Sequence, residues 1–96
     1  MELMVSDKAA KWYKDELNLQ SGDGVRFFVR YGGFNSLQSG FSLGVSIEKP
    51  VESAIKVEEE GITFFVEEAD IWYFDNHNLK VAFDEKKEEP EFEYIS

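Results

Sequence analysis

Hydrophobic residues near the N-terminus recur at the spacing of a helix. Ala9, Tyr13 and Leu17 follow one another at intervals of four residues, which is the repeat of the buried face of an amphipathic helix. Ser6 stands just before this segment, and serine is a favoured N-cap because its hydroxyl accepts a hydrogen bond from the first helical turn. The pattern therefore predicts a helix from Asp7 to Leu17.

Most of the remaining chain alternates apolar with polar residues, which is the repeat of a strand with one buried face. The clearest example is the run from Phe41 to Ile47. We expect strands within residues 1–5, 25–31, 41–47, 54–58, 62–66 and 79–83, and a last short strand holding Phe92 and Tyr94. Between the expected strands at 62–66 and 79–83, Ala69, Trp72 and Tyr73 fit one or two helical turns.

These elements predict an α+β domain with a mostly antiparallel sheet. We expect the sheet to roll into a β-sandwich or a small barrel, accompanied by the N-terminal helix and the one short helix. A chain of 96 residues predicts a single domain, residues 1–96, because domains of this size have one hydrophobic core. Aromatic residues make up 16% of the chain, which favours a packed core over disorder.

Acidic residues are concentrated in the second part of the chain. Residues 1–56 have equal numbers of acidic and basic side chains, whereas residues 57–96 carry the whole net charge of −10. Such a field repels phosphate backbones and anionic lipids, so we expect neither nucleic acid nor a membrane as partner. The N-terminus lacks the pattern of a signal peptide, and the expected location is the cytoplasm.

Few residues offer catalytic or metal-binding chemistry. His77 is the only histidine, and its neighbours in residues 75–78 are typical of a turn, so we rank it as a weak candidate metal ligand. The acidic runs at 58–60, 67–68 and 88–89 lack the spacing of a calcium loop, and we expect them to be solvated. Because no nucleophile lies beside a base in the sequence, a non-enzymatic protein is expected.

A glycine- and serine-rich segment, residues 30–40 (RYGGFNSLQSG), joins two expected strands. A dinucleotide fingerprint places its glycines between a strand and a helix, and a phosphate-binding loop ends in Lys followed by Ser or Thr. Neither arrangement occurs here. We therefore expect Gly32 and Gly33 to serve the backbone, because glycine adopts positive φ angles at little cost.

Several stretches in the same order resemble the HesB/IscA-like family of A-type iron–sulphur cluster carriers. They are VSDKAA at 5–10, VRFFVRYGGF at 25–34, GITFFV at 61–66, and IWYFD at 71–75 followed by Leu79. The resemblance covers most of the chain. It implies a HesB-like fold, assembly into dimers or tetramers, and a role among iron–sulphur assembly proteins.

The chain departs from this family at the cluster ligands. The family holds its cluster with three cysteines, one in the loop after the second of those stretches and two in the C-terminal tail. This chain has no cysteine, and the loop position after Gly33 is Phe34. The segment at the family's ligand position is Gly32, Gly33, Phe34 and Asn35. None of the family's cluster ligands is therefore present, and no cofactor is expected. In this respect the chain resembles the cysteine-free, YneR-type branch of HesB-like proteins.

We therefore predict a non-enzymatic HesB-like domain that acts by binding a protein partner, such as a component of iron–sulphur assembly. A homodimer is also expected, with Trp72 and Tyr73 as a candidate contact patch. One alternative is an iron or cluster carrier that uses His77 and carboxylates of the tail as ligands. Another is a small-ligand-binding module with a groove lined by aromatic residues, namely Phe28, Phe34 and Phe41.

Overall fold

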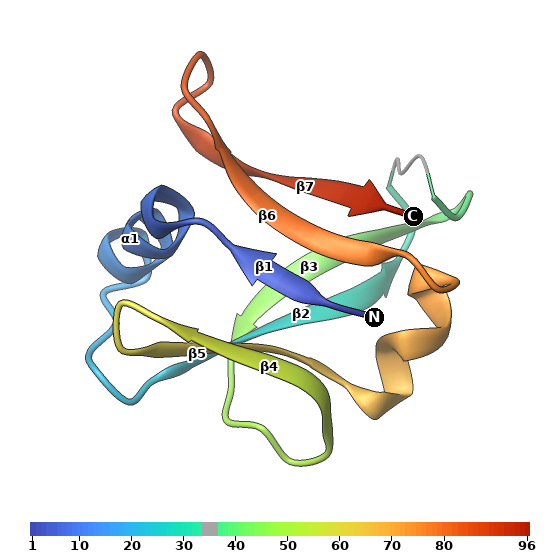
Figure 1. Ribbon diagram of the computed structural model, residues 1–96, viewed down its shortest axis with the longest axis horizontal. Helices are drawn as coiled ribbons and strands as arrows, with labels where there is room; N and C mark the ends of the chain where they lie inside the picture. The colour runs from blue at the N-terminus through green and yellow to red at the C-terminus, as the bar shows by residue number, and fades with distance from the viewer. Residues whose placement is uncertain (34–36) are drawn as a thin grey trace.

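The computed structural model describes residues 1–33 and 37–96, and these form seven strands, one α-helix and one 3₁₀ helix (Figure 1). In chain order the elements are β1 (Leu3–Val5), α1 (Asp7–Glu16), β2 (Gly24–Tyr31), β3 (Phe41–Ile47), β4 (Ser53–Glu59), β5 (Ile62–Glu67), η1 (Glu68–Phe74), β6 (Asn78–Asp84) and β7 (Glu89–Ile95). The helix and strands expected from the sequence are all present, with boundaries that differ by at most two residues.

Helix α1 begins as its sequence predicts. The Ser6 Oγ accepts a hydrogen bond from the backbone N–H of Ala9 at 3.1 Å, and Asp7 in the first turn places negative charge at the positive end of the helix dipole. Ala9, Ala10 and Tyr13 are buried, so this face packs on the sheets. The helix ends before Asn18, which has a positive φ of 52°.

The strands form two mixed sheets in which most neighbouring pairs are antiparallel. One sheet has the order β1-β6-β7 and the other the order β3-β2-β5-β4. Within them, β1 runs parallel to β6 and β2 runs parallel to β5, while the other three pairs are antiparallel. The α+β class and the two-sheet arrangement are confirmed. The barrel alternative is wrong, because the described strands do not close into a single sheet.

The hydrophobic core lies between the two sheets. In Figure 1, α1 closes one end of this space and η1 lies at the opposite end. The largest side chains with almost no exposed surface are Phe27, Phe64, Phe65, Tyr73 and Phe74. The sequence suggested that Tyr73 belongs to a surface contact patch. The structure shows instead that Tyr73 is a core residue. Its neighbour Trp72 is 52% exposed.

The register of β2 and β3 separates two residues that we had expected to share a groove. Phe28 lies opposite Gly44, and Tyr31 lies opposite Phe41. Side chains alternate between the faces of a sheet, so Phe28 and Phe41 lie on opposite faces. A Cβ on Gly44 would come within 2.5 Å of the Phe28 ring, which shows that the ring covers this glycine. The predicted aromatic groove is thus wrong for the two of its residues that the structure describes.

One carboxylate that we had expected to be solvated is buried. Glu67 is 8% exposed, and its two oxygens accept hydrogen bonds from the backbone N–H groups of Val51 and Glu52, both at 3.0 Å. These bonds compensate for the loss of water around the charge. Glu67 therefore fastens the loop between β3 and β4 to the end of β5.

Candidate partner-binding site

Three aromatic side chains from separate elements form a continuous surface, which we call the aromatic ridge: Tyr31, Phe41 and Trp72. The ring centroids of Tyr31 and Phe41 are 5.3 Å apart, and those of Phe41 and Trp72 are also 5.3 Å apart, each pair edge to face. Tyr31 is 91% exposed and Trp72 is 52% exposed. Exposed aromatic residues in contact with one another are typical of protein-binding surfaces.

The strand register and an ion pair bring the aromatic ridge together. Tyr31 ends β2 and Phe41 begins β3, and these two residues are paired partners across the sheet. Trp72 belongs to η1, which is tied to β2 by a hydrogen bond of 2.9 Å from the Arg26 guanidinium to the Asp70 carboxylate. The loop after Gly33 also contributes, because Gln38 Nε2 donates to the Tyr73 carbonyl at 3.4 Å.

The electrostatics of Arg26 support this ion pair. Burial alone would lower the pKa of Arg26, but the hydrogen bond and charge of Asp70, with a smaller contribution from Glu48, raise the pKa above its ordinary value. Asp70 is itself buried. Among the described residues, the Arg26 Nε has no hydrogen-bond partner, so the side chain depends on its two carboxylates.

The glycines of the predicted site lie next to the aromatic ridge. Gly32 and Gly33 have φ angles of +95° and +82°, which confirms that this backbone needs the conformational freedom of glycine. The Gly32 N–H donates to the Gly40 carbonyl at 2.7 Å, and this bond closes the loop at its base. Phe34 and Asn35, the other two predicted residues, lie outside the described residues.

His77 belongs to a turn in the structure. Its Nδ1 lies 3.0 Å from the carbonyl oxygens of both Phe74 and Asp75, a geometry in which an N–H at Nδ1 donates to the backbone. Asp75 and Asn76 have positive φ angles, as in a tight turn. Within residues 1–33 and 37–96, no three His, Asp or Glu side chains come together in a way that could hold a metal ion.

The donor atoms of this chain do not fit a thiolate-bound iron–sulphur cluster. Cluster iron is held mainly by cysteine sulphur, and the chain contains no cysteine. Of the residues at the family's loop position, Gly32 and Gly33 are described, and they follow Tyr31 of the aromatic ridge directly. What this arrangement can do chemically is bury aromatic surface against another molecule.

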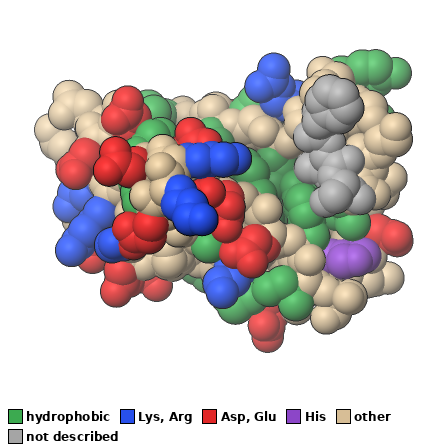
Figure 2. All heavy atoms as spheres, turned by 90° about the horizontal axis from the view of Figure 1, so that it is seen from above, with side chains coloured by type: hydrophobic (Ala, Val, Ile, Leu, Met, Phe, Trp, Pro, Cys, Tyr) green, Lys and Arg blue, Asp and Glu red, His purple; other side chains and the backbone are tan. Residues whose placement is uncertain are grey.

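On one face of the molecule, hydrophobic side chains gather apart from most of the charged ones. Figure 2 shows hydrophobic side chains gathered in the middle and right-hand part of one face, whereas most of the Lys, Arg, Asp and Glu side chains of that view lie to the left. No helix among the described residues is long and apolar enough to cross a membrane.

Comparison with known proteins places the chain in a family. The family model for iron–sulphur cluster biosynthesis matches residues 1–94, and the chain belongs to this family, as its resemblance to HesB/IscA-like proteins had indicated. The family is one of scaffolds and carriers for iron–sulphur assembly rather than of classical enzymes.

Two relatives illustrate the range of similarity. A protein of Bacillus subtilis (strain 168) named pyruvate dehydrogenase inhibitor is 55% identical over 94 residues, which cover 98% of this chain and 99% of the relative. An uncharacterized protein of Staphylococcus saprophyticus is 44% identical over 82 residues, covering 82% of this chain and 84% of that protein.

Two solved structures share the fold. Escherichia coli SufA, described as involved in the biosynthesis of iron–sulphur clusters, matches with a TM-score of 0.59 and 20% identity, covering 97% of this chain and 78% of SufA. A protein from Aquifex aeolicus matches with a TM-score of 0.50 and 18% identity, covering 100% of this chain and 95% of that one. At these identities the likeness concerns the fold and not the activity.

Sequence reasoning found part of the aromatic ridge and missed the rest. Trp72 was expected at the surface, whereas Phe41 was expected in a groove with Phe28 and Phe34, and Tyr31 only at the junction of a strand and the glycine-rich segment. A usable signal was present, because Tyr31 directly precedes Gly32 and Phe41 directly follows Gly40. The contact of Phe41 with Trp72 depends on how η1 packs on β2, which is a long-range feature.

Proposed function

We propose that this protein is a non-enzymatic regulator that inhibits the pyruvate dehydrogenase complex by direct protein contact. The observation that carries the proposal is the 55% identity to the Bacillus subtilis pyruvate dehydrogenase inhibitor over almost the whole of both chains. The absence of cysteine supports it, because a chain without soft ligands is poorly suited to carry a thiolate-bound cluster.

The aromatic ridge is the contact surface in this proposal. Tyrosine and tryptophan are enriched among the residues that contribute most to binding at protein interfaces. Tyr31 and Trp72 have large exposed areas, and Phe41 between them is half-buried. A partner that covers the three rings would remove this apolar surface from water, which is the main favourable contribution to association.

The test is an inhibition assay with purified components. The Bacillus subtilis pyruvate dehydrogenase complex is assayed by NADH formation while the concentration of the protein is increased. We expect saturable inhibition, and we expect the double variant Tyr31→Ala/Trp72→Ala to need about tenfold more protein or more for the same effect.

Ile47→Ala is the matched control. Ile47 is also exposed, at 56%. Phe41 begins β3 and Ile47 ends it, so Ile47 lies away from the aromatic ridge and the loss of its side chain should leave inhibition unchanged. Absence of inhibition by the folded wild-type protein would reject the proposed function. Full inhibition by the double variant would reject the aromatic ridge while leaving the function in place.

Self-association and location form part of the same proposal. We expect the protein in the cytoplasm, and we expect a homodimer in which Trp72 is a contact residue. Light scattering measures the molar mass of the wild type and of Trp72→Ala, each with and without the pyruvate dehydrogenase complex. These masses show whether a second copy of the chain and the partner compete for the aromatic ridge. If a component of iron–sulphur assembly is captured from the native cell in place of the complex, the partner is of that class instead.

A further inference from the structure

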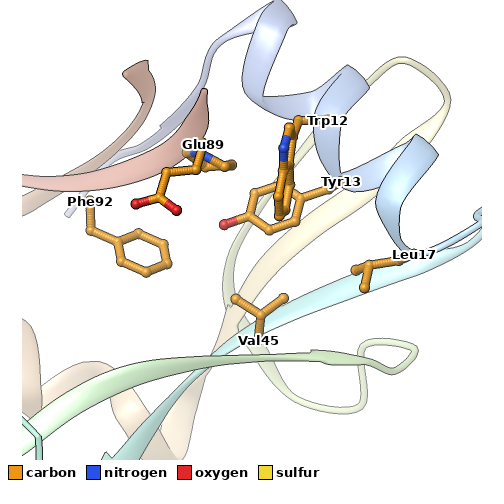
Figure 3. Close-up of a pocket in the computed structure, with 7 residues that line it drawn as sticks. Trp12, Tyr13, Leu17, Val45, Glu89 and Phe92 are labelled. Carbon is orange, nitrogen blue, oxygen red and sulfur yellow. The ribbon is translucent and has the colours of Figure 1, made fainter. Parts of the chain in front are cut away.

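A pocket lies between helix α1 and strands β3 and β7, at the end of the molecule opposite to η1 (Figures 1 and 3). Its volume is about 300 Å³, which is enough for a single long side chain but small for a typical cofactor. The residues that define its chemistry are Trp12, Tyr13 and Leu17 of α1, Val45 of β3, and Glu89 and Phe92 of β7.

The aromatic walls of this pocket are already in place. The Trp12 and Tyr13 rings are edge to face with centroids 5.3 Å apart. Tyr13 and Phe92 both contact the buried ring of Phe27, at centroid distances of 6.0 and 5.6 Å. Because these contacts belong to the core, the rings have little freedom to move, and a ligand would not have to order them.

The pocket has a single charge, and it is negative. Glu89 is the only charged residue among the seven described residues that line it. Figure 3 shows the Glu89 carboxylate and the Tyr13 hydroxyl turned toward the same space near the Phe92 ring. Burial raises the pKa of Tyr13 well above its ordinary value, so its phenol offers a neutral hydroxyl to this space.

This combination selects one kind of occupant. A cation is attracted to the faces of aromatic rings, most strongly to that of tryptophan. A lysine or arginine side chain also has an apolar stem that packs on aliphatic residues, here Leu17 and Val45. The Glu89 carboxylate would repel an anionic ligand and attract a cationic one. The net charge of −10, all of it within residues 57–96, draws basic partners toward the molecule.

We propose that the pocket formed by Trp12, Phe92 and Glu89 binds a lysine or arginine side chain presented by a partner protein. The inference goes beyond the proposed inhibition, because it concerns a second surface at the other end of the fold. It does not require that the partner is the pyruvate dehydrogenase complex.

The test uses small compounds that mimic one side chain at a time. The ¹⁵N-labelled protein is titrated with the N-acetyl, N-methylamide derivatives of arginine, lysine and norleucine, and the chemical shifts are followed by NMR. Norleucine is the matched control because it has a stem like that of lysine without the charge. We expect the Trp12 indole and the amides of Tyr13, Glu89 and Phe92 to shift saturably with arginine and lysine, and the Trp72 indole to stay fixed.

Two variants separate specific binding from general attraction to an acidic protein. Glu89→Gln should weaken the arginine and lysine derivatives about fivefold or more. Glu91→Gln removes the same charge from a neighbouring exposed position of β7 that does not line the pocket, and it should bind like the wild type. Equal shifts with norleucine, no shift at Trp12 with any compound, or equal losses in the two variants would each overturn the proposal. Because both positions are exposed, neither substitution should prevent folding.

Discussion

The two tryptophans of this protein lie at opposite ends of the fold, one in the wall of a pocket and the other on an exposed surface. Trp12 is half-buried and forms a wall of the pocket beside α1. Trp72 is 52% exposed and belongs to the aromatic ridge beside η1. Both take part in edge-to-face contacts with neighbouring rings at 5.3 Å, so the local aromatic packing is alike.

The difference between the two ends comes from what surrounds the rings. At the pocket, residues of α1, β3 and β7 line a hollow that has one carboxylate, which suits a single basic side chain. At the aromatic ridge, the exposed rings of Tyr31 and Trp72 lie on either side of the half-buried ring of Phe41, which suits the surface of a larger partner. In our two proposals the same residue type serves two kinds of recognition, and the two indole N–H signals report the two ends separately.

The largest expected effect comes from removing the ring that supports the pocket. Phe27 is fully buried and its ring supports both Tyr13 and Phe92. Phe27→Ala should lower the free energy of unfolding by about 3–5 kcal/mol, because a large cavity opens in the core. Chemical denaturation measures this loss, and NMR of the folded protein should show the Trp12 indole shifting more than that of Trp72.

Tyr31→Ala on the same strand is the control for that prediction. Its side chain is 91% exposed, so the free energy of unfolding should change by less than about 0.5 kcal/mol. An equal response of both indoles to Phe27→Ala would mean that the two ends form one coupled unit.

The next effect tests the support of the aromatic ridge. Asp70→Asn removes the buried charge that holds Arg26, and we expect a loss of roughly 1–3 kcal/mol because a partly buried guanidinium loses its main partner. The Trp72 indole signal should shift while that of Trp12 stays in place. Glu68→Gln, at an exposed position of η1, is the control and should be close to neutral. A fixed Trp72 signal would argue that packing alone positions η1.

A smaller effect concerns the glycines beside the aromatic ridge. Gly33→Val should destabilise the protein by roughly 1–3 kcal/mol, because the φ of +82° disfavours a branched residue and a Cβ would lie 2.7 Å from the Ser42 Oγ. Gly32→Ala isolates the backbone cost, about 1 kcal/mol, since nothing lies within 4 Å of a Cβ at that position. Denaturation midpoints equal to that of the wild type would show that this loop tolerates ordinary residues.

The smallest expected effect is a pH-dependent contribution of the surface residue Glu48 to the free energy of unfolding. The hydrogen bond from the Ser46 hydroxyl, reinforced by Arg26, lowers the pKa of Glu48 below its ordinary value. A carboxyl group with a lowered pKa stabilises the folded state at neutral pH, and this contribution is lost as the pH falls through the folded pKa. Glu48→Gln should therefore cost a few tenths of a kcal/mol at pH 7 and nothing in acid. A difference that is independent of pH would contradict this origin.

Local patterns in the sequence predicted the elements well. Ser6 caps α1 as expected, and β3 has the predicted boundaries. These features depend on neighbouring residues, so a short window contains the information. The predicted resemblance to an iron–sulphur assembly family also held, because the order of the matching stretches extends over most of the chain.

Pairing between distant elements was harder to predict. The parallel contacts of β1 with β6 and of β2 with β5 join segments far apart in the chain, and alternation alone does not say which strands meet. The burial of Glu67 was missed for the same reason, because its partners Val51 and Glu52 come from another loop. An acidic pair in the sequence gives no sign of the backbone N–H groups that it will meet.

By itself, the amino-acid sequence determined the family, the helix and strands, and the absence of any thiol that could grip cluster iron, because each is a property of residue types and their local order. Only the tertiary structure decided that Tyr31, Phe41 and Trp72 form one surface and that Glu89 stands beside the rings of Trp12 and Phe92. Such juxtapositions follow from sheet register and from the packing of helices on sheets, which bring together side chains that are remote along the chain.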